Sequence, residues 1–142
     1  MMNSQDPFQQ LYHDLGRDNV SYERLAQCYS KEIEFTDPFH HVQGLDALTH
    51  YFTQMYTNVR AIDFEFIHSL SQGELNIQRW TMSFRHPAIA AGKEVTVEGC
   101  SELVWRDGKI IRHTDFFDAG SMLYEHLPVF GWAIRKLKER MQ

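Results

Sequence analysis

The residues best suited to acid-base chemistry are a histidine and an aspartate near the end of the chain. His113 and Asp115 are separated by one residue in a run that is typical of a β-strand. Because successive side chains of a strand point to opposite faces, the two share a face with Ile111 and Phe117. A carboxylate and an imidazole among apolar neighbours are costly unless hydrogen-bonded, and such pairs occur in proton-transfer sites. The alternative is that His113 and Asp115 form a hydrogen-bonded pair that only stabilises the sheet, and both interpretations stay open.

Two further candidates lie earlier in the chain. Asp37 stands directly before Pro38, and Tyr12 lies on the apolar stripe of the first predicted helix. A carboxylate can act as a general base, and a phenol can donate a hydrogen bond. Each also has a structural interpretation, since Asp-Pro is typical of a turn and a tyrosine on an apolar stripe usually packs in the core.

No metal or other cofactor is expected. His40 and His41 lie in the loop after Asp37, but no His-x-His or Glu-x-x-His spacing supports a ligand set there. Cys28 and Cys100 show no Cys-x-x-Cys spacing, and we interpret them as small hydrophobic side chains with reduced thiols.

The composition favours one domain that binds small molecules. The chain has 142 residues, 43% of them hydrophobic, and a net charge of -5. This length supports a single hydrophobic core, which predicts one domain over 1–142 with a core at about 8–118 and a helical extension at about 120–140. The acidic balance argues against a nucleic-acid partner, and no apolar run is long enough to insert stably in a membrane. We expect a cytoplasmic protein, since the sequence starts without a charged and apolar leader.

Periodicity divides the chain into helices followed by strands. Helices are predicted from Asp6-Pro7 to Gly16, after Ser21, and from Gly44 to about Val59, with a short strand at 32–36. From Ala61 the apolar period becomes two, which predicts a four-stranded antiparallel meander. The result is an α+β domain in which N-terminal helices cover one face of a bent sheet and enclose a pocket.

The second strand of the meander contains a shift in its apolar phase. Leu75 and Ile77 alternate in one phase, and the residues from Trp80 onward alternate in the other. We interpret the shift as a β-bulge near Gln78-Arg79, because a one-residue insertion rotates the following side chains. The side chains expected to line an apolar ligand pocket are Trp80, Met82, Phe84, Ser101, Leu103 and Phe117.

Four segments together resemble the nuclear transport factor 2-like superfamily, in particular its SnoaL-like and ketosteroid isomerase-like branches. They are 35–39, which contains Asp37-Pro38, then 44–48, 105–110 and 113–118. The resemblance covers about 8–118. It implies a cone-shaped fold, a mostly antiparallel and strongly bent sheet around a pocket, and a homodimer formed through the exposed sheet face.

The resemblance also implies roles for particular residues. In the ketosteroid isomerase pattern, Asp37 matches the general base and Tyr12 the oxyanion-hole tyrosine, whereas Ser101 stands where a protonated aspartic acid is expected. In the SnoaL-like pattern, Asp115 matches the acid-base carboxylate. The pattern of limonene epoxide hydrolases needs an arginine and an aspartate one residue apart on an earlier strand, and Thr81 replaces that acid two residues after Arg79.

These observations predict a pocket protein for a small hydrophobic molecule. We expect a cofactor-independent isomerase, cyclase or hydrolase that uses Asp115 as proton shuttle, with His113 orienting it and Asp37 and Tyr12 assisting. The alternative is a ligand-binding or regulatory module of the same fold without catalysis. A basic helix at 127–140 is predicted to pack on the body, on a neighbouring subunit or on an acidic membrane surface.

Overall fold

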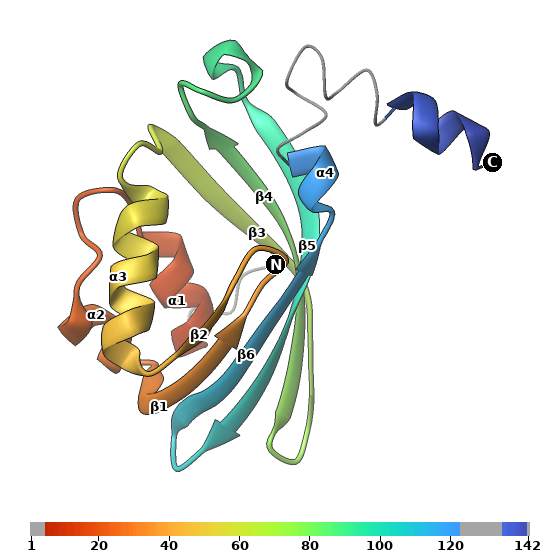
Figure 1. Ribbon diagram of the computed structural model, residues 1–142. Coiled ribbons are helices and arrows are strands. Elements are labelled where there is room, and N and C mark those ends of the chain that lie inside the picture. Colours follow the sequence, from red (N-terminus) through yellow and green to blue (C-terminus); the bar gives the residue numbers. More distant parts are fainter. Residues whose placement is uncertain (1–4, 123–134, 142) are drawn as a thin grey trace.

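The computed structural model describes residues 5–122 and 135–141, and its N-terminal helices lie on one face of a single curled sheet (Figure 1). The helices are α1 (Pro7–Asp14), α2 (Tyr22–Ala26), α3 (Leu45–Tyr56), α4 (Ala119–Met122) and the short 3-10 helix η1 (Ala90–Gly92). The strands are β1 (Tyr29–Thr36), β2 (His41–Gln43), β3 (Ala61–Gln72), β4 (Leu75–Arg85), β5 (Val95–Arg106) and β6 (Lys109–Phe117). Residues 135–140 are also helical.

The helices begin where the sequence predicts them, for identifiable reasons. The Asp6 carboxylate accepts hydrogen bonds from two free amides of α1, and Pro7 occupies the first helical position. The Ser21 hydroxyl caps α2 in the same way. Gly44 precedes α3 with φ of 92°, a conformation that L side chains rarely adopt.

The sheet has six strands in the order β2-β1-β6-β5-β4-β3. All neighbouring pairs are antiparallel except β1 and β6, which are parallel. This parallel pairing carries the early strand β1 to the side of the late strand β6, so residues distant in sequence share one concave face. The predicted α+β class and bent, mostly antiparallel sheet are confirmed, whereas β2 was not foreseen.

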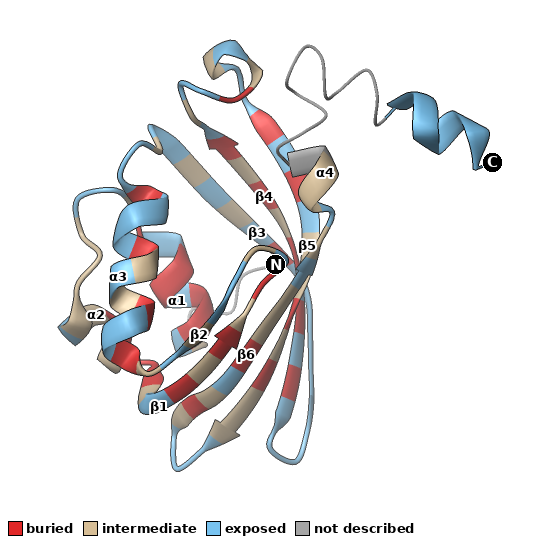
Figure 2. Ribbon diagram, viewed as in Figure 1, coloured by how far each residue is buried: buried red, intermediate tan, exposed pale blue. Residues whose placement is uncertain are grey.

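Buried side chains concentrate where α1 and α3 meet the concave face (Figure 2). On β5, Val95, Val97, Ser101 and Leu103 are all buried, so the predicted pocket residues Ser101 and Leu103 face inward. On β6, His113 is buried and Asp115 and Phe117 are partly buried, as predicted. A register shift between β5 and β6 makes Ile110 the buried residue at the start of β6, so the prediction for Ile111 is wrong.

The predicted β-bulge at Gln78-Arg79 is also wrong. Strand β4 pairs with β5 without interruption, and its inner face continues through Asn76 and Gln78, while Leu75 and Ile77 face outward. The irregularity lies opposite, in β3, where the register shifts between Phe66 and His68. The shift also moves His68 and Leu70 to the exposed face, although the sequence period had placed them with Phe66.

Hydrogen bonding explains why polar residues occupy the inner face of β4. Gln78 is fully buried, and its amide donates to Asp6 Oδ2 and to Asn76 Oδ1, both at 3.0 Å. It also accepts a hydrogen bond of 2.9 Å from Gln9 Nε2. A buried amide with all these partners avoids the desolvation penalty of an unpaired group. The network therefore ties the first turn of α1 to β4.

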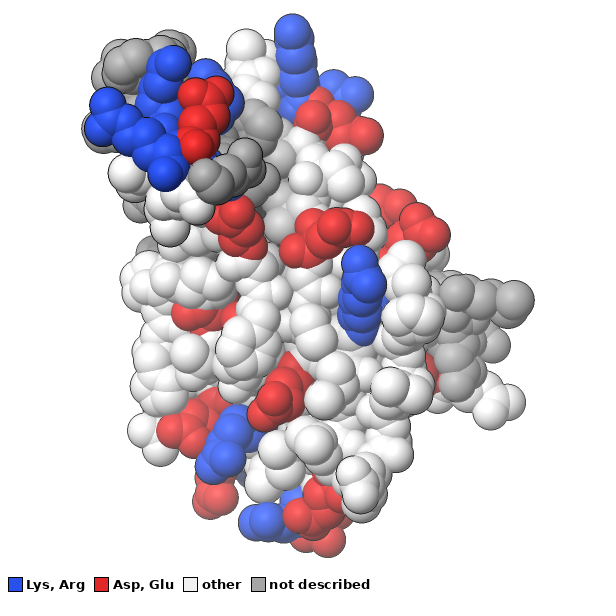
Figure 3. Space-filling model, turned by 90° about the vertical axis from the view of Figure 1, so that its right-hand side faces the viewer, with Lys and Arg blue, Asp and Glu red and all other residues white. Residues whose placement is uncertain are grey.

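The convex face of the sheet carries several exposed apolar side chains. Leu70 is 72% exposed and Phe116 is 55% exposed. Figure 3 shows this face, over which uncharged side chains are interspersed with acidic and basic ones. Of the predicted basic helix at 127–140, the part from 127 to 134 lies outside the described residues, and Lys138 in the remainder is 3.3 Å from Asp118 Oδ2.

We predict that replacing Gln78 destabilises the fold more than replacing its apolar neighbour. Gln78→Leu removes one hydrogen bond each from Gln9, Asn76 and Asp6 and should cost about 2–4 kcal/mol of unfolding free energy. The control Ile77→Thr changes an outward side chain and should cost less than about 1 kcal/mol. Urea unfolding of both variants measures the difference, and the reverse order would contradict the buried network.

Candidate active site

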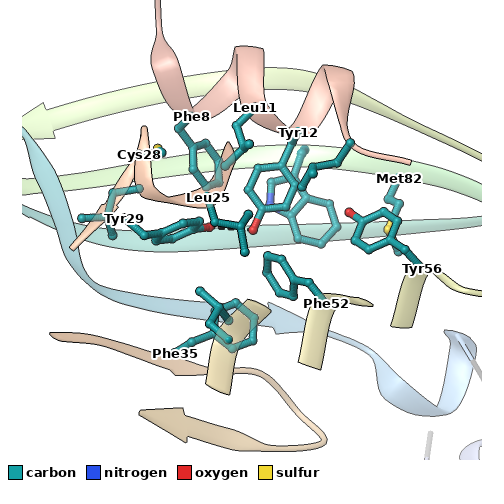
Figure 4. Packing of buried hydrophobic residues seen from close by; sticks show 14 of the residues in the cluster. Phe8, Leu11, Tyr12, Leu25, Cys28, Tyr29, Phe35, Phe52, Tyr56 and Met82 are labelled. Carbon is teal, nitrogen blue, oxygen red and sulfur yellow. Dashed lines mark hydrogen bonds between the residues drawn. The ribbon is translucent and has the colours of Figure 1, made fainter. Parts of the chain in front are cut away.

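A cavity of about 360 Å³ lies between α1, α3 and the concave face of the sheet. Its wall is mostly aromatic, with rings from α1, α3 and strands β1, β3, β4 and β6. Figure 4 shows how the side chains of α1 and α3 converge on this interior. The volume is within the range of small-molecule pockets, which are typically apolar with a few polar groups. The polar groups on the wall therefore determine what chemistry is possible.

Asp115 presents its carboxylate to this cavity from β6. Its Oδ1 accepts a hydrogen bond from Ser101 Oγ at 2.5 Å and lies 2.6 Å from His113 Nε2. Ser101 is the cross-strand partner of Asp115, which brings the two side chains together. Oδ2 has no hydrogen-bond partner within residues 5–122 and 135–141. Every fully buried polar side-chain atom of these residues has a partner. An atom without a partner is therefore accessible, and since Asp115 lines the cavity, Oδ2 is open to it.

His113 lies behind Asp115 and is almost completely buried. Its Nδ1 is 2.8 Å from the Tyr29 hydroxyl, which in turn is 2.6 Å from the Tyr12 hydroxyl. A neutral His113 with hydrogen on Nε2 uses every donor: Tyr12 donates to Tyr29, Tyr29 to Nδ1, and Nε2 to Asp115. The four groups form one continuous series of hydrogen bonds from Tyr12 to Asp115.

Tyr12 and Tyr29, the two tyrosines hydrogen-bonded in series with His113, act as donors rather than bases. Burial raises the pKa of Tyr12 and of Tyr29 well above the usual value for a phenol, with neighbouring tyrosine, cysteine and aspartate groups as smaller causes. Both hydroxyls therefore stay protonated at neutral pH. Tyr12, matched above to an oxyanion-hole residue, is committed to Tyr29 in this structure.

Asp37 also reaches the cavity wall, but its environment differs from that of Asp115. Its Oδ1 accepts hydrogen bonds from the amides of Phe39 and His40 at 2.8 and 2.9 Å. Its Oδ2 accepts a hydrogen bond of 2.6 Å from the Tyr51 hydroxyl. Both oxygens thus fasten the turn between β1 and β2 to α3, which is the arrangement of an Asx turn.

Trp80 connects the aromatic wall to the polar site. Its Nε1 donates a 2.9 Å hydrogen bond to Ser101 Oγ, which leaves the Ser101 hydrogen free for Asp115. The indole lies over Gly99, its cross-strand partner, where an added Cβ would be 2.3 Å from Cη2 of the ring. Only a residue without a side chain permits this ring position.

The other predicted site residues divide into two groups. Met82, Phe84 and Phe117 lie on the cavity wall together with Trp80, Ser101 and Asp115. Leu103, by contrast, is fully buried and lies outside the wall.

Sequence reasoning missed three tyrosines: Tyr29, Tyr51 and Tyr56. Tyr56 follows Phe52 by four residues, so helical spacing could have placed it on the inner face of α3. Tyr29 gave no such signal, because its partner is reached only through the parallel pairing of β1 with β6.

The described part of the chain contains neither a metal-binding cluster nor a membrane-spanning helix. Residues 5–122 and 135–141 hold no group of three or more His, Cys, Asp or Glu side chains that could bind a metal ion. None of their helices is long and apolar enough to cross a membrane.

We predict that Gly99→Ala disrupts the site through Trp80. The new methyl group displaces the indole, which should break the bond from Nε1 to Ser101 Oγ and cost about 1–3 kcal/mol of stability. The control Gly16→Ala meets no atom within 4 Å and should have little effect. Thermal melting and the indole N–H resonance of Trp80 test this, and an unmoved resonance in Gly99→Ala would refute it.

The sequence matches the SnoaL-like domain over residues 8–113. Among solved structures, it is similar to a proposed SnoaL-like polyketide cyclase from Jannaschia sp. CCS1, with TM-score 0.71, 10% identity and coverage of 82% of this chain and 85% of that chain. A protein of ketosteroid isomerase-like fold from Catenulispora acidiphila DSM 44928, in complex with trimethylamine, gives TM-score 0.72, 8% identity and coverage of 87% and 93%. TsrD from Streptomyces laurentii gives TM-score 0.65, 18% identity and coverage of 85% and 95%.

At these identities the structural likeness establishes the fold alone, and no curated protein matches the sequence significantly. The domain match covers most of the chain and agrees with the six-stranded curled sheet. The chain therefore belongs to the SnoaL-like domain family.

Proposed function

We propose that the protein is a cofactor-independent enzyme that transfers a proton on a small apolar molecule, with Asp115 as the general base and acid. The observation that carries this proposal is the asymmetry of the Asp115 carboxylate. Oδ1 is held by Ser101 and His113, while Oδ2 is open to an aromatic cavity. A base must reach the proton that it removes, and Oδ2 is placed to do so.

The neighbours of Asp115 position the carboxylate and leave the proton transfer to it. Ser101 and His113 hold Oδ1 by hydrogen bonds, which fixes the direction in which Oδ2 points. A proton taken from the ligand onto Oδ2 can return from the same atom to a different position. His113 is a positioning residue in this scheme, because it contacts Asp115 and does not line the cavity.

The surroundings favour isomerisation or cyclisation over hydrolysis of an epoxide. Water activation of the hydrolase type would need an arginine and a carboxylate directed into the cavity. Arg79 instead lies on the convex face, 3.6 Å from Glu98, and its side chain is 54% exposed. Thr81, two residues further along β4, carries no carboxylate.

We predict that Asp115→Asn abolishes catalysis without unfolding the protein. The amide oxygen can still accept from Ser101 and His113, but the side chain no longer takes up a proton, so the rate should fall by about 10²- to 10⁴-fold. The measurement is the rate at which the α-hydrogens of 2-acetylnaphthalene are replaced by deuterium in D₂O, monitored by NMR. Thermal melting checks that the variant remains folded.

Glu98→Gln is the matched control, since it makes the same chemical change on the convex face, where the side chain is 72% exposed. Exchange should continue at the wild-type rate in this variant. If Asp115→Asn melts far below the wild type and exchanges as fast, Asp115 is a structural residue. The protein would then be a ligand-binding module rather than an enzyme.

We also propose that a second copy of the chain covers the convex sheet face. The support is the set of exposed apolar side chains there, with Leu70 and Phe116 the most exposed of the sheet. Sedimentation at micromolar concentration should give about twice 16.8 kDa, and Leu70→Lys with Phe116→Lys should give a monomer. A wild-type monomer under these conditions removes the proposal.

A further inference from the structure

Tyr56 is a cavity residue to which the proposed mechanism has so far given no role. It is the last residue of α3, is only 4% exposed and packs its ring against Phe52 with centroids 6.2 Å apart. In Figure 4 its hydroxyl points away from α3 into the interior, toward the side on which Tyr12 lies, and Met82 lies beside its ring. Its place on the wall makes it available to a ligand.

The Tyr56 hydroxyl has no hydrogen-bond partner within residues 5–122 and 135–141. Every fully buried polar side-chain atom of these residues has a partner, so the unpartnered Tyr56 hydroxyl is accessible, and its access is from the cavity that Tyr56 lines. An uncommitted phenol in an apolar wall is unusual, because buried polar groups are normally paired. Its natural partner is an acceptor that enters the cavity from outside.

The other hydroxyls of the wall are already committed. Tyr12 is bound to Tyr29, Tyr51 donates to Asp37, and Ser101 donates to Asp115. Among the described wall residues, Tyr56 is therefore the hydroxyl that remains free to donate to a ligand. Tyr12 was the sequence-based candidate for this role, and its bond to Tyr29 points to Tyr56 instead.

Tyr56 keeps its hydrogen over the physiological range. Burial, and secondarily the negative charge of Asp115, raise its pKa well above the usual value for a phenol. Tyr56 and Asp115 line the same cavity, so the donor and the proposed base face one enclosed space. A donor near a base is the arrangement that proton removal beside a carbonyl requires.

The charges of the wall restrict the ligand further. Two carboxylates, Asp37 and Asp115, lie on it, and no Lys or Arg does so among the described residues. An anionic ligand would face repulsion from both carboxylates in a medium of low dielectric constant, and the basic side chains of the described wall are only those of His40 and His86. A neutral molecule that brings one acceptor and one removable hydrogen fits this wall.

We propose that Tyr56 donates a hydrogen bond to the carbonyl oxygen of a neutral, apolar ligand whose α-hydrogen faces Asp115 Oδ2. This inference rests on the proposed role of Asp115 and adds the catalytic group that stabilises the product of proton removal. The proton passes from the α-carbon to Oδ2, and the electron pair of the broken C–H bond moves to give an enolate oxygen. Tyr56 stabilises that oxygen until Oδ2 returns the proton to carbon.

The test uses 2-acetylnaphthalene and 2-isopropylnaphthalene, which have similar shape but differ in the carbonyl acceptor. Tyr56→Phe should weaken binding of the ketone by about three- to tenfold and change binding of the hydrocarbon by less than twofold. In wild-type protein the infrared C=O stretch of the bound ketone should lie below its value in hexane. In Tyr56→Phe it should return toward the hexane value.

Tyr12→Phe discriminates between the two tyrosines and should retain the lowered C=O stretch. Loss of the shift in Tyr12→Phe, or its persistence in Tyr56→Phe, overturns the proposal. If the ketone does not bind to the wild-type protein, or binds with an unshifted C=O stretch, the proposal is overturned even when the variants do not fold. If the proposed function alone fails, Asp115→Asn still exchanges α-hydrogens while the Tyr56-dependent shift remains.

Discussion

The site depends on a single constraint, which is that one oxygen of Asp115 must be held inside the protein while the other stays open. Donors from five elements meet this constraint. Ser101 and His113 bond to Oδ1 directly, Trp80 supports Ser101, and the Tyr12 and Tyr29 hydroxyls complete the partners of His113. Hydrogen bonds in such a chain polarise one another, so the carboxylate is fixed by the whole network rather than by one neighbour. The parallel pairing of β1 with β6 and the absence of a side chain at Gly99 both serve this geometry.

The two carboxylates of the cavity show how surroundings assign different roles to the same group. Asp37 has three donors distributed over its two oxygens and fastens a turn, so both of its oxygens are engaged. Asp115 has both of its donors on one oxygen. In the sequence each matches an acid-base residue of a related branch, with Asp115 as the expected proton shuttle and Asp37 as an assisting group. The distribution of donors separates them, and favours Asp115 as the group that exchanges a proton.

The sequence allowed the local parts of this structure to be predicted, but not the pairings between distant parts. Caps at Asp6 and Ser21 and a period of two on β6 correctly indicated two helix starts and a shared face for His113 and Asp115. The bulge at Gln78 was wrong because hydropathy cannot indicate that a glutamine is buried when its partners come from α1 and β4. Tyr29 was missed because it meets His113 across 84 positions of sequence. Such contacts follow from strand order, which no short pattern encodes.

The same physics explains why an uncommitted donor and acceptor are informative in this protein. Elsewhere in the described residues even a fully buried amide such as that of Gln78 has its partners, because each unpaired polar group would cost stability. The Tyr56 hydroxyl and Asp115 Oδ2 depart from this pattern together, on the wall of one aromatic cavity. In a low-dielectric cavity each is poorly solvated and therefore gains more from a complementary ligand than it would in water. Both atoms are reached from the cavity, and one molecule that brings an acceptor and an acidic hydrogen gives each of them a partner.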